Sequence, residues 1–242
     1  MAGAIVAGQG LGLANSSLGL VGERRVVGQA QWSRSGDRVY VNAATGNLVV
    51  QQQDEWLVGR GPDAGLVRTY NSLGGAGYDR DNGDNWLLGF NRRVLGVDGA
   101  ATVTRVDEDG LERVYERVGA KYVSKSGDGA YDTLSFSGGQ WTWTDGDTQL
   151  QEVYEAAGVA GQFRLKTVRD ARGVALTLNY LDGKLSEVVT ASGDKLIFTY
   201  VAGTNNLEKV LDTAGAGGRP RVTYTYDASN RLLNRPGFPR HP

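Results

Sequence analysis

The sequence predicts an all-β protein, with an N-terminal β-module followed by stacked β-hairpin repeats that form a curved, spiralling open sheet. The first observation is an internal repeat, because Leu165, Val168 and Gly173 recur 20 residues later and again after a further 22. The second is that the strand after each glycine alternates apolar and polar residues, which is typical of a strand with one buried face. The third is the presence of 36 glycines and only 5 prolines among 242 residues, which suits many tight turns.

The turns between these strands support a hairpin repeat. Residues 170–173 and 212–215 each place Asp first and Gly fourth, as a type I turn prefers. Asp182-Gly183 predicts a two-residue hairpin turn, because glycine accepts a positive φ without a Cβ clash. Each unit of about twenty residues is therefore one hairpin with its connection, which must stack on its neighbours to bury its apolar face.

The end of the third copy carries a recognisable motif. Residues 226–232 read Tyr-Asp-Ala-Ser-Asn-Arg-Leu and resemble the Tyr-Asp-x-x-Gly-Arg-Leu core of the YD repeats of RHS proteins. Asn230 stands in place of the glycine, and asparagine also visits the left-handed region. The residues that carry this signature are Tyr180, Gly183, Tyr200, Tyr226, Asp227, Arg231 and Leu232.

An earlier segment resembles the N-terminal module that precedes the repeats in RHS proteins. The resemblance rests on Val41, Asn42, Gly46 and Asn47, on Gly-Arg-Gly-Pro at 59–62, and on Arg-Thr-Tyr-Asn-Ser at 68–72. We expect a flexible or loosely packed Gly/Ala-rich leader at 1–36, because this apolar stretch lacks the charged start of a secretory signal. The module is predicted at 37–100, degenerate repeats at 101–160, clear repeats at 165–232 and a disordered tail at 233–242, with the repeat region as a whole spanning 101–232.

Composition excludes several kinds of chemistry. The 26 basic and 27 acidic side chains nearly balance, so no electrostatic footprint for nucleic acid is visible. There is no cysteine and a single histidine, His241, so serine or cysteine triads and zinc sites cannot be assembled. No apolar run is long enough to span a bilayer.

The acidic clusters and the glycine-rich motif favour structural roles. Residues 79–84 are similar to a calcium loop, but a glycine occupies the fifth position and Phe90 the twelfth, so we predict a solvated turn and no metal site. Asp107, Glu108 and Asp109 are predicted to be turn and surface residues. Gly59-Arg60-Gly61 is not a phosphate loop, because no helix follows it, and we expect it to serve a bulge.

The aromatic residues leave a binding function open. Tyr180, Phe198, Tyr200 and Tyr224 lie in phase, which predicts a ladder of rings on the buried face. Trp141 and Trp143 share a face and are the better candidates for an exposed pair that stacks on a glycan. The alternative function is therefore an autonomous carbohydrate-binding or surface-adhesion module. A carboxylate-based glycosidase is a third hypothesis, for which no motif selects the two acids.

The RHS resemblance implies a scaffold without catalytic activity or cofactor. In that family, long runs of repeats wind into a hollow shell around a C-terminal toxin domain. We therefore expect the opening segment of such a shell in a larger bacterial polymorphic toxin, secreted or on the cell surface without a recognisable cleaved signal peptide. The expected partners are the remaining repeats or the toxin domain.

The C-terminal end of the chain suggests a fragment of such a shell. Prolines at 236, 239 and 242 cannot continue a central strand. About five hairpins cannot close a shell, so an open sheet edge near Tyr224 and Tyr226 predicts self-association.

Overall fold

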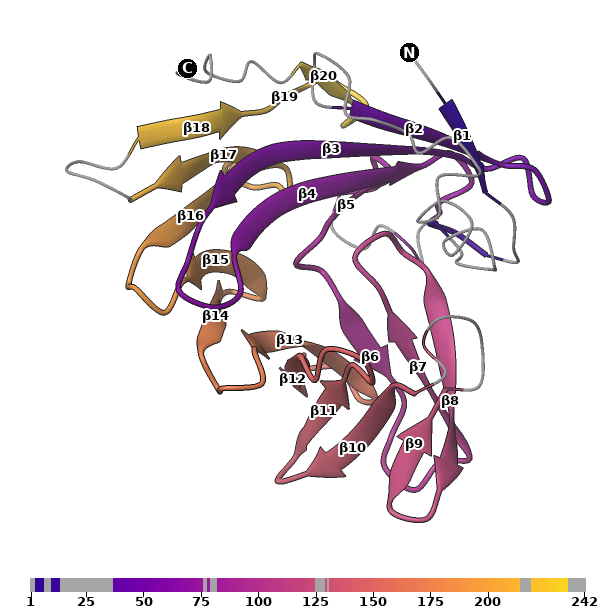
Figure 1. Cartoon of the computed structure of the whole chain (residues 1–242). Coiled ribbons are helices and arrows are strands. Elements are labelled where there is room, and N and C mark those ends of the chain that lie inside the picture. The colour runs from indigo at the N-terminus through magenta and orange to yellow at the C-terminus, as the bar shows by residue number, and fades with distance from the viewer. Residues whose placement is uncertain are drawn as a thin grey trace.

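The computed structural model describes residues 3–6, 10–13, 37–75, 78, 82–124, 129, 131–213 and 219–234. Every extended element in these residues is a β-strand, and almost all neighbouring strands run antiparallel (Figure 1). The all-β prediction is confirmed.

The N-terminal sheet has five strands in sequential order. They are β1 (Gly3–Val6), β2 (Asp37–Asn42), β3 (Leu48–Leu57), β4 (Ala64–Asn71) and β5 (Trp86–Leu88). β1 runs parallel to β2, whereas the other neighbours are antiparallel. The expectation of a flexible or loosely packed leader is therefore wrong for residues 3–6, which add a strand to this sheet. Most of the rest of the leader lies outside the described residues.

The second sheet begins with eight strands that close on themselves. They are β6 (Arg93–Leu95), β7 (Thr102–Val106), β8 (Glu112–Val118), β9 (Lys121–Val123), β10 (Thr133–Ser137), β11 (Gln140–Thr144), β12 (Gln151–Ala156) and β13 (Gln162–Arg169). β13 pairs with β12 on one side and, through residues 162–164, with β6 on the other. We call this closed set the strand ring. An open sheet was predicted, and the closure was not foreseen.

The rest of the second sheet continues from the same strand β13. Its C-terminal residues 167–169 pair with β14, so β13 belongs both to the strand ring and to an open extension. This repeat sheet consists of β14 (Ala175–Leu181), β15 (Lys184–Val189), β16 (Lys195–Tyr200), β17 (Leu207–Asp212) and β18 (Arg219–Thr223). Figure 1 shows it climbing in a curve from β14 to β18, beside β3 of the N-terminal sheet. A separate pair, β19 (Thr225–Tyr226) and β20 (Leu232–Asn234), follows.

The predicted turns are present where the structure describes them. Asp182 and Gly183 have φ angles of 50° and 80°, so both residues adopt the positive values of a type I′ hairpin turn. The amide of Gly173 donates to the carbonyl of Asp170 over 2.9 Å, which closes the predicted turn at 170–173. Asn230 has a φ of 60°, as expected for a residue that replaces the glycine of the repeat motif.

The two sheets share one hydrophobic core. The N-terminal sheet contributes Leu57, Leu66 and Leu88, and the repeat sheet contributes its alternating column that includes Leu178 and Phe198. The ring of Phe90 meets that of Phe198 edge-on at 6.2 Å, although 108 residues separate them in the sequence. The repeats therefore bury their apolar face against the N-terminal sheet as well as against one another.

Candidate functional site

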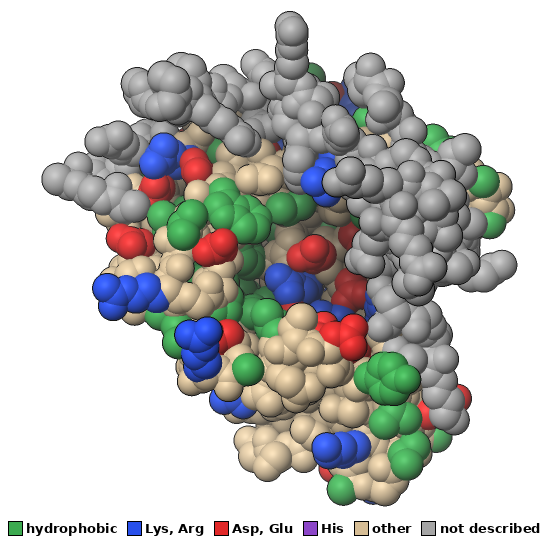
Figure 2. Space-filling model, in the orientation of Figure 1, with side chains coloured by type: hydrophobic (Ala, Val, Ile, Leu, Met, Phe, Trp, Pro, Cys, Tyr) green, Lys and Arg blue, Asp and Glu red, His purple; other side chains and the backbone are tan. Residues whose placement is uncertain are grey.

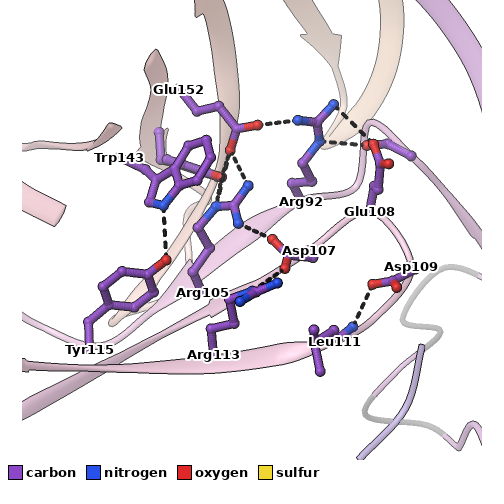
Figure 3. Close-up of polar contacts among 12 residues, drawn as sticks. Arg92, Arg105, Asp107, Glu108, Asp109, Leu111, Arg113, Tyr115, Trp143 and Glu152 are labelled. Carbon is purple, nitrogen blue, oxygen red and sulfur yellow. Dashed lines mark hydrogen bonds and ion pairs between the residues drawn. The ribbon is translucent and has the colours of Figure 1, made fainter. Parts of the chain in front are cut away.

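A highly charged buried region lies inside the strand ring, around Glu152 of β12. The Glu152 side chain is fully buried and binds two arginines, Arg92 and Arg105 (Figure 3). Its Oε2 accepts hydrogen bonds from Nη2 and Nε of Arg105 over 2.7 and 3.2 Å, and Oε1 accepts one from Nη1 of Arg92. One buried carboxylate thus compensates two guanidinium groups, one from the connection just before β6 and one from β7.

The same cluster reaches the turn between β7 and β8. Arg105 also pairs with Asp107, whose second oxygen accepts a hydrogen bond from Nε of Arg113 over 2.9 Å. Arg92 approaches Glu108 at 3.6 Å. We call Arg92, Arg105, Asp107, Arg113 and Glu152 the Glu152 cluster. The expectation that Asp107 is a surface residue is wrong, because the closure of the ring brings Arg105 and Arg113 to it; of the three turn acids, Glu108 alone stays largely exposed.

The pKa values of Glu152 and its neighbour Tyr154 are shifted in opposite directions. Burial raises the pKa of Glu152, but Arg105 and Arg92 outweigh it and hold that pKa at about 2. Burial raises the pKa of the Tyr154 phenol, which donates to Glu152 and stays protonated. A general acid or base works best with a pKa near the ambient pH, so these two groups are suited to holding the ring together rather than to proton transfer.

The two tryptophans that were candidates for glycan stacking line the interior of the ring. Trp141 is fully buried, with its ring against Tyr122 at 5.1 Å and Phe136 at 5.0 Å. Trp143 is 7% exposed, and its Nε1 donates to the Tyr115 hydroxyl over 2.9 Å. The expectation of an exposed tryptophan pair is therefore wrong. The strands alternate as predicted, but closure of the ring turns the face that carries both side chains inward.

Asp109 joins three parts of the chain. Its carboxylate accepts hydrogen bonds from the amides of Leu13 and Leu111 over 2.6 and 3.0 Å, and its carbonyl accepts one from Nδ2 of Asn71. Asp109 is buried, and this burial raises the pKa of its carboxyl. The expectation of a surface residue is wrong here too, since the segment 10–13 covers the turn.

The asparagines of the N-terminal module are buried hydrogen-bonding residues. Nδ2 of Asn47 donates to Oδ1 of Asn71 over 2.8 Å, and the amide of Gly12 donates to the same oxygen. Oδ1 of Asn42 accepts the amides of Ala44 and Thr45, which fixes the turn after β2. These side chains satisfy backbone groups where strands end, as buried polar groups must.

A β-bulge in β3 connects the N-terminal sheet to the far end of the repeat sheet. The pairing of β3 with β4 skips Asp54, whose buried side chain forms an ion pair with Arg68. The hydroxyl of Tyr224 donates to Oδ2 of Asp54 over 2.5 Å, across 170 residues of sequence. The Arg68 guanidinium lies between the rings of Trp86 and Tyr224, at 4.7 and 4.6 Å. We call Asp54, Arg68 and Tyr224 the Asp54 clasp.

The Gly-Arg-Gly-Pro motif forms the loop of the β3–β4 hairpin, so the expectation that it serves a bulge is wrong. Gly61 has a φ of 106°, and a Cβ there would lie 2.6 Å from a side-chain carbon of Val174. At Gly59 a Cβ would lie 3.5 Å from Thr190. The small residues let the loop contact two turns of the repeat sheet, a long-range contact without local signal.

The repeat signature has a regular geometry that sequence reasoning missed. The hydroxyl of Tyr180 donates to the carbonyl of Leu165 over 2.6 Å, that of Tyr200 to Leu185 over 3.0 Å, and that of Tyr226 to Leu207 over 3.1 Å. Each tyrosine therefore binds the leucine that begins its own unit. The constant separation of 15 residues in the first two units was the available signal.

The same tyrosines mark irregularities in strand pairing. The register shifts by one residue immediately before Tyr154, Tyr180, Tyr200 and Tyr226, and their partners are Leu165, Leu185, Leu207 and Leu232. Such bulges increase the local twist of a sheet. The repeat sheet contains the bulges at Tyr180 and Tyr200 and a further register shift between β17 and β18, all of which add to its twist.

The remaining signature residues organise the last turn. Asp227 accepts the amides of Ser229 and Arg231, and its Oδ2 accepts Nε of Arg231 over 2.7 Å. Asp and Arg of the motif therefore bind each other across the turn.

The other candidates from the sequence form no site in the described residues. Of residues 79–84, the first three lie outside the described ranges, and Asp84 accepts the amide of Trp86 as part of a turn. His241 is also outside them. Within the described residues no group of three or more His, Cys, Asp or Glu could hold a metal ion, and no helix is long and apolar enough to cross a membrane.

Part of this chain is similar in sequence to large bacterial proteins that are named as tRNA nucleases. Residues 39–115 match a family described as a domain of unknown function, DUF6531. The chain is 31% identical over 161 residues to the tRNA nuclease WapA of Bacillus subtilis, and equally to a tRNA(Glu)-specific WapA of B. subtilis subsp. natto and a tRNA3(Ser)-specific WapA of Bacillus spizizenii. The match covers 66% of this chain but only 6% of each relative.

Proposed function

We propose that this chain is the opening segment of a YD-repeat shell, which encapsulates or presents a toxin domain within a larger secreted or surface-exposed bacterial protein. Its partners would be further repeats and the toxin domain of that protein. The chain itself would act as a scaffold without catalysis.

The observation that carries the proposal is the repeated tyrosine–leucine unit. Three hairpins use the same hydroxyl-to-carbonyl hydrogen bond, and the last of them lies in the final described strands. Because each hairpin contacts mainly its neighbours, the pattern can be extended by adding units, as in other repeat proteins. The bulge in each unit would make a longer array spiral.

The relatives support a role separate from their nuclease activities. Two of them are named for different tRNAs, yet both share the same 31% identity with this chain over 161 residues. A segment that resembles proteins of different specificity to the same extent is a better candidate for a common framework than for the tRNA-cleaving domain. The tightly paired charges of the Glu152 cluster also suit a framework.

Size-exclusion chromatography with light scattering tests the scaffold role, on the full chain and on a version ending at Leu232. We expect concentration-dependent oligomers in both, because β18 ends the second sheet and an edge strand can pair with another chain. A compact monomer in both at high concentration would argue for an autonomous module instead.

A cleavage assay tests the absence of catalysis. The purified chain, incubated with total tRNA and a divalent cation, should leave the RNA intact. Cleavage that persists through purification and co-elutes with the folded chain would overturn this part of the proposal.

A further inference from the structure

A pocket of about 320 Å³ opens where three parts of the molecule meet. Its walls come from the β5–β6 connection, the start of β13 in the strand ring, and the ends of β14, β15 and β16. Figure 2 shows that the molecule is hollowed on the face between the N-terminal sheet and the strand ring, and that basic and acidic side chains gather on the floor of the hollow. The volume lies at the lower end of the range for ligand pockets, which suits a small group or a short segment.

The charged residues of the pocket lining are mainly basic. Four basic residues, Arg92, Arg93, Arg164 and Lys184, face one acidic residue, Asp182. Arg92 is already compensated by Glu152, and Arg164 by Glu155 at 2.9 Å. The ammonium group of Lys184 donates to the carbonyl of Thr204 over 2.5 Å rather than to a carboxylate. The carboxylates that pair with Arg92 and Arg164 lie outside the lining, in which the positive charges of Lys184 and Arg93 exceed the negative charge of Asp182.

Two of the lining cations, Arg164 and Lys184, are held in place by tyrosines of the repeat. The Arg164 guanidinium lies 4.0 Å from the ring of Tyr180, and the Lys184 ammonium lies 5.2 Å from the ring of Tyr200. Both rings are fixed in turn by the hydroxyl bonds to leucine carbonyls. Cations that are already ordered lose little conformational entropy when they bind a ligand.

We propose that this pocket binds a short acidic polypeptide segment, whose carboxylates contact Lys184 and Arg164. The inference rests on the proposed scaffold function and names the chemistry by which the scaffold would hold an enclosed chain. Carboxylates match the charge of the lining, and Arg164 can still donate through Nη1, since its bonds to Glu155 use Nε and Nη2.

The lining favours a peptide over a phosphate. The lining also includes the rings of Phe163, Tyr180 and Tyr200 and the side-chain amides of Asn91 and Gln162. Amides supply both donors and acceptors, as a peptide backbone requires, whereas phosphate offers only acceptors. Phosphate sites commonly use backbone amides at a helix N-terminus, and the described elements of this chain are strands.

Fluorescence anisotropy with labelled octaglutamate and the full chain tests the proposal. We expect salt-dependent binding that weakens about tenfold or more in the double variant Lys184→Gln/Arg164→Gln, because close charge pairs contribute at least that much to complexes. The matched control is Lys195→Gln, which removes a cation that pairs with Glu187 and does not line the pocket. This control should bind within about twofold of the wild type.

Three outcomes would overturn the proposal. One is the absence of octaglutamate binding to the wild-type chain, and another is equal weakening in the double variant and in Lys195→Gln. The third is displacement of the peptide by inorganic phosphate at constant ionic strength, or tighter binding of octauridylate, which would assign the pocket to phosphates. Light scattering on the double variant tests the scaffold role independently of peptide binding, because the oligomers of this variant should match those of the wild type.

Discussion

Glu152 occupies a position that an apolar side chain would normally fill. It alternates with Tyr154 on the inward face of β12, and its full burial is tolerated because Arg92 and Arg105 both bind it. Removing one member of a buried charge cluster is costly, since the remaining charges lose their compensation without regaining water.

Glu152→Gln should therefore lower the free energy of unfolding by about 3–5 kcal/mol. The matched control is Glu187→Gln, which removes half of a partly exposed ion pair with Lys195 and should cost about 1 kcal/mol or less. Urea denaturation of both variants provides the comparison. Equal losses would show that the Glu152 cluster contributes no more than a surface pair.

The same carboxylate should make the fold sensitive to acid. Its folded pKa of about 2 lies below the unfolded value of 4.5, so its stabilising effect is complete above about pH 4.5 and is lost as the pH falls through 2. A shift of this size corresponds to about 3 kcal/mol. Asp109 and Asp132 have raised pKa values and act in the opposite direction, because they favour the folded state more at low pH.

Unfolding free energies of the wild type and Glu152→Gln between pH 5 and pH 2 would isolate this effect, because Asp109 and Asp132 contribute equally to both proteins. The wild type should lose its advantage as the pH falls. A constant difference between the two proteins would contradict a depressed Glu152 pKa.

Residue types alone could not reveal this cluster. Arg105 and Glu152 lie in phase with the apolar residues Val103 and Tyr154, which is a visible anomaly in the alternation. Glu152, however, lies 47 residues after Arg105 and 60 residues after Arg92, so these ion pairs depend on the closure of the ring. The expectation of exposed tryptophans was wrong for the same reason, since an alternating strand does not say whether its face closes inward.

At the level of elements, the sequence predicts the hairpins but not the closure of the strand ring. The turns at 170–173 and 182–183 follow from local residue chemistry, and the structure contains both. Ring closure depends on β13 pairing with β6, about 70 residues earlier, for which the sequence carries no turn or periodicity signal. The bulges at the tyrosines were also unforeseen, although the tyrosine positions were identified.

The tyrosine–leucine hydrogen bond should stabilise each hairpin separately. Tyr200→Phe removes the hydroxyl that donates to the carbonyl of Leu185 and should cost about 1 kcal/mol. Amide hydrogen exchange should quicken in β15 and β16 more than in the strand ring, because repeat units open locally. The exposed Tyr131→Phe is the control and should change neither quantity. A uniform increase in exchange across the chain would contradict the local role.

At the scale of the whole molecule, the Asp54 clasp connects the N-terminal sheet to the last residues of the repeat region. Its members lie in β3, in β4 and just after β18, and Arg221 adds a contact to Glu55 at 3.6 Å. The repeat sheet is therefore anchored at both ends, by shared strand β13 and by the clasp.

Releasing the clasp should increase self-association. Tyr224→Phe removes the hydroxyl that binds Asp54 and should cost about 1.5–3 kcal/mol, as for a hydrogen bond to a charged group. Light scattering over a concentration series should show more oligomer than for the wild type, since β18 would be less firmly held. Tyr226→Phe keeps the clasp and serves as the control. If the variant loses stability but forms no additional oligomer, the clasp does not limit pairing at the β18 edge.

The double membership of β13 gives the repeat array a fixed origin. Hairpins could be added after β18 without disturbing the strand ring. The number of hairpins can therefore vary while the strand ring keeps the same eight strands. One residue inserted between Leu165 and Val168 would turn the rest of β13, which pairs with β14, to the other face, because a shift by one residue exchanges the two faces of a strand. The closed end thus sets the register in which the repeat sheet begins.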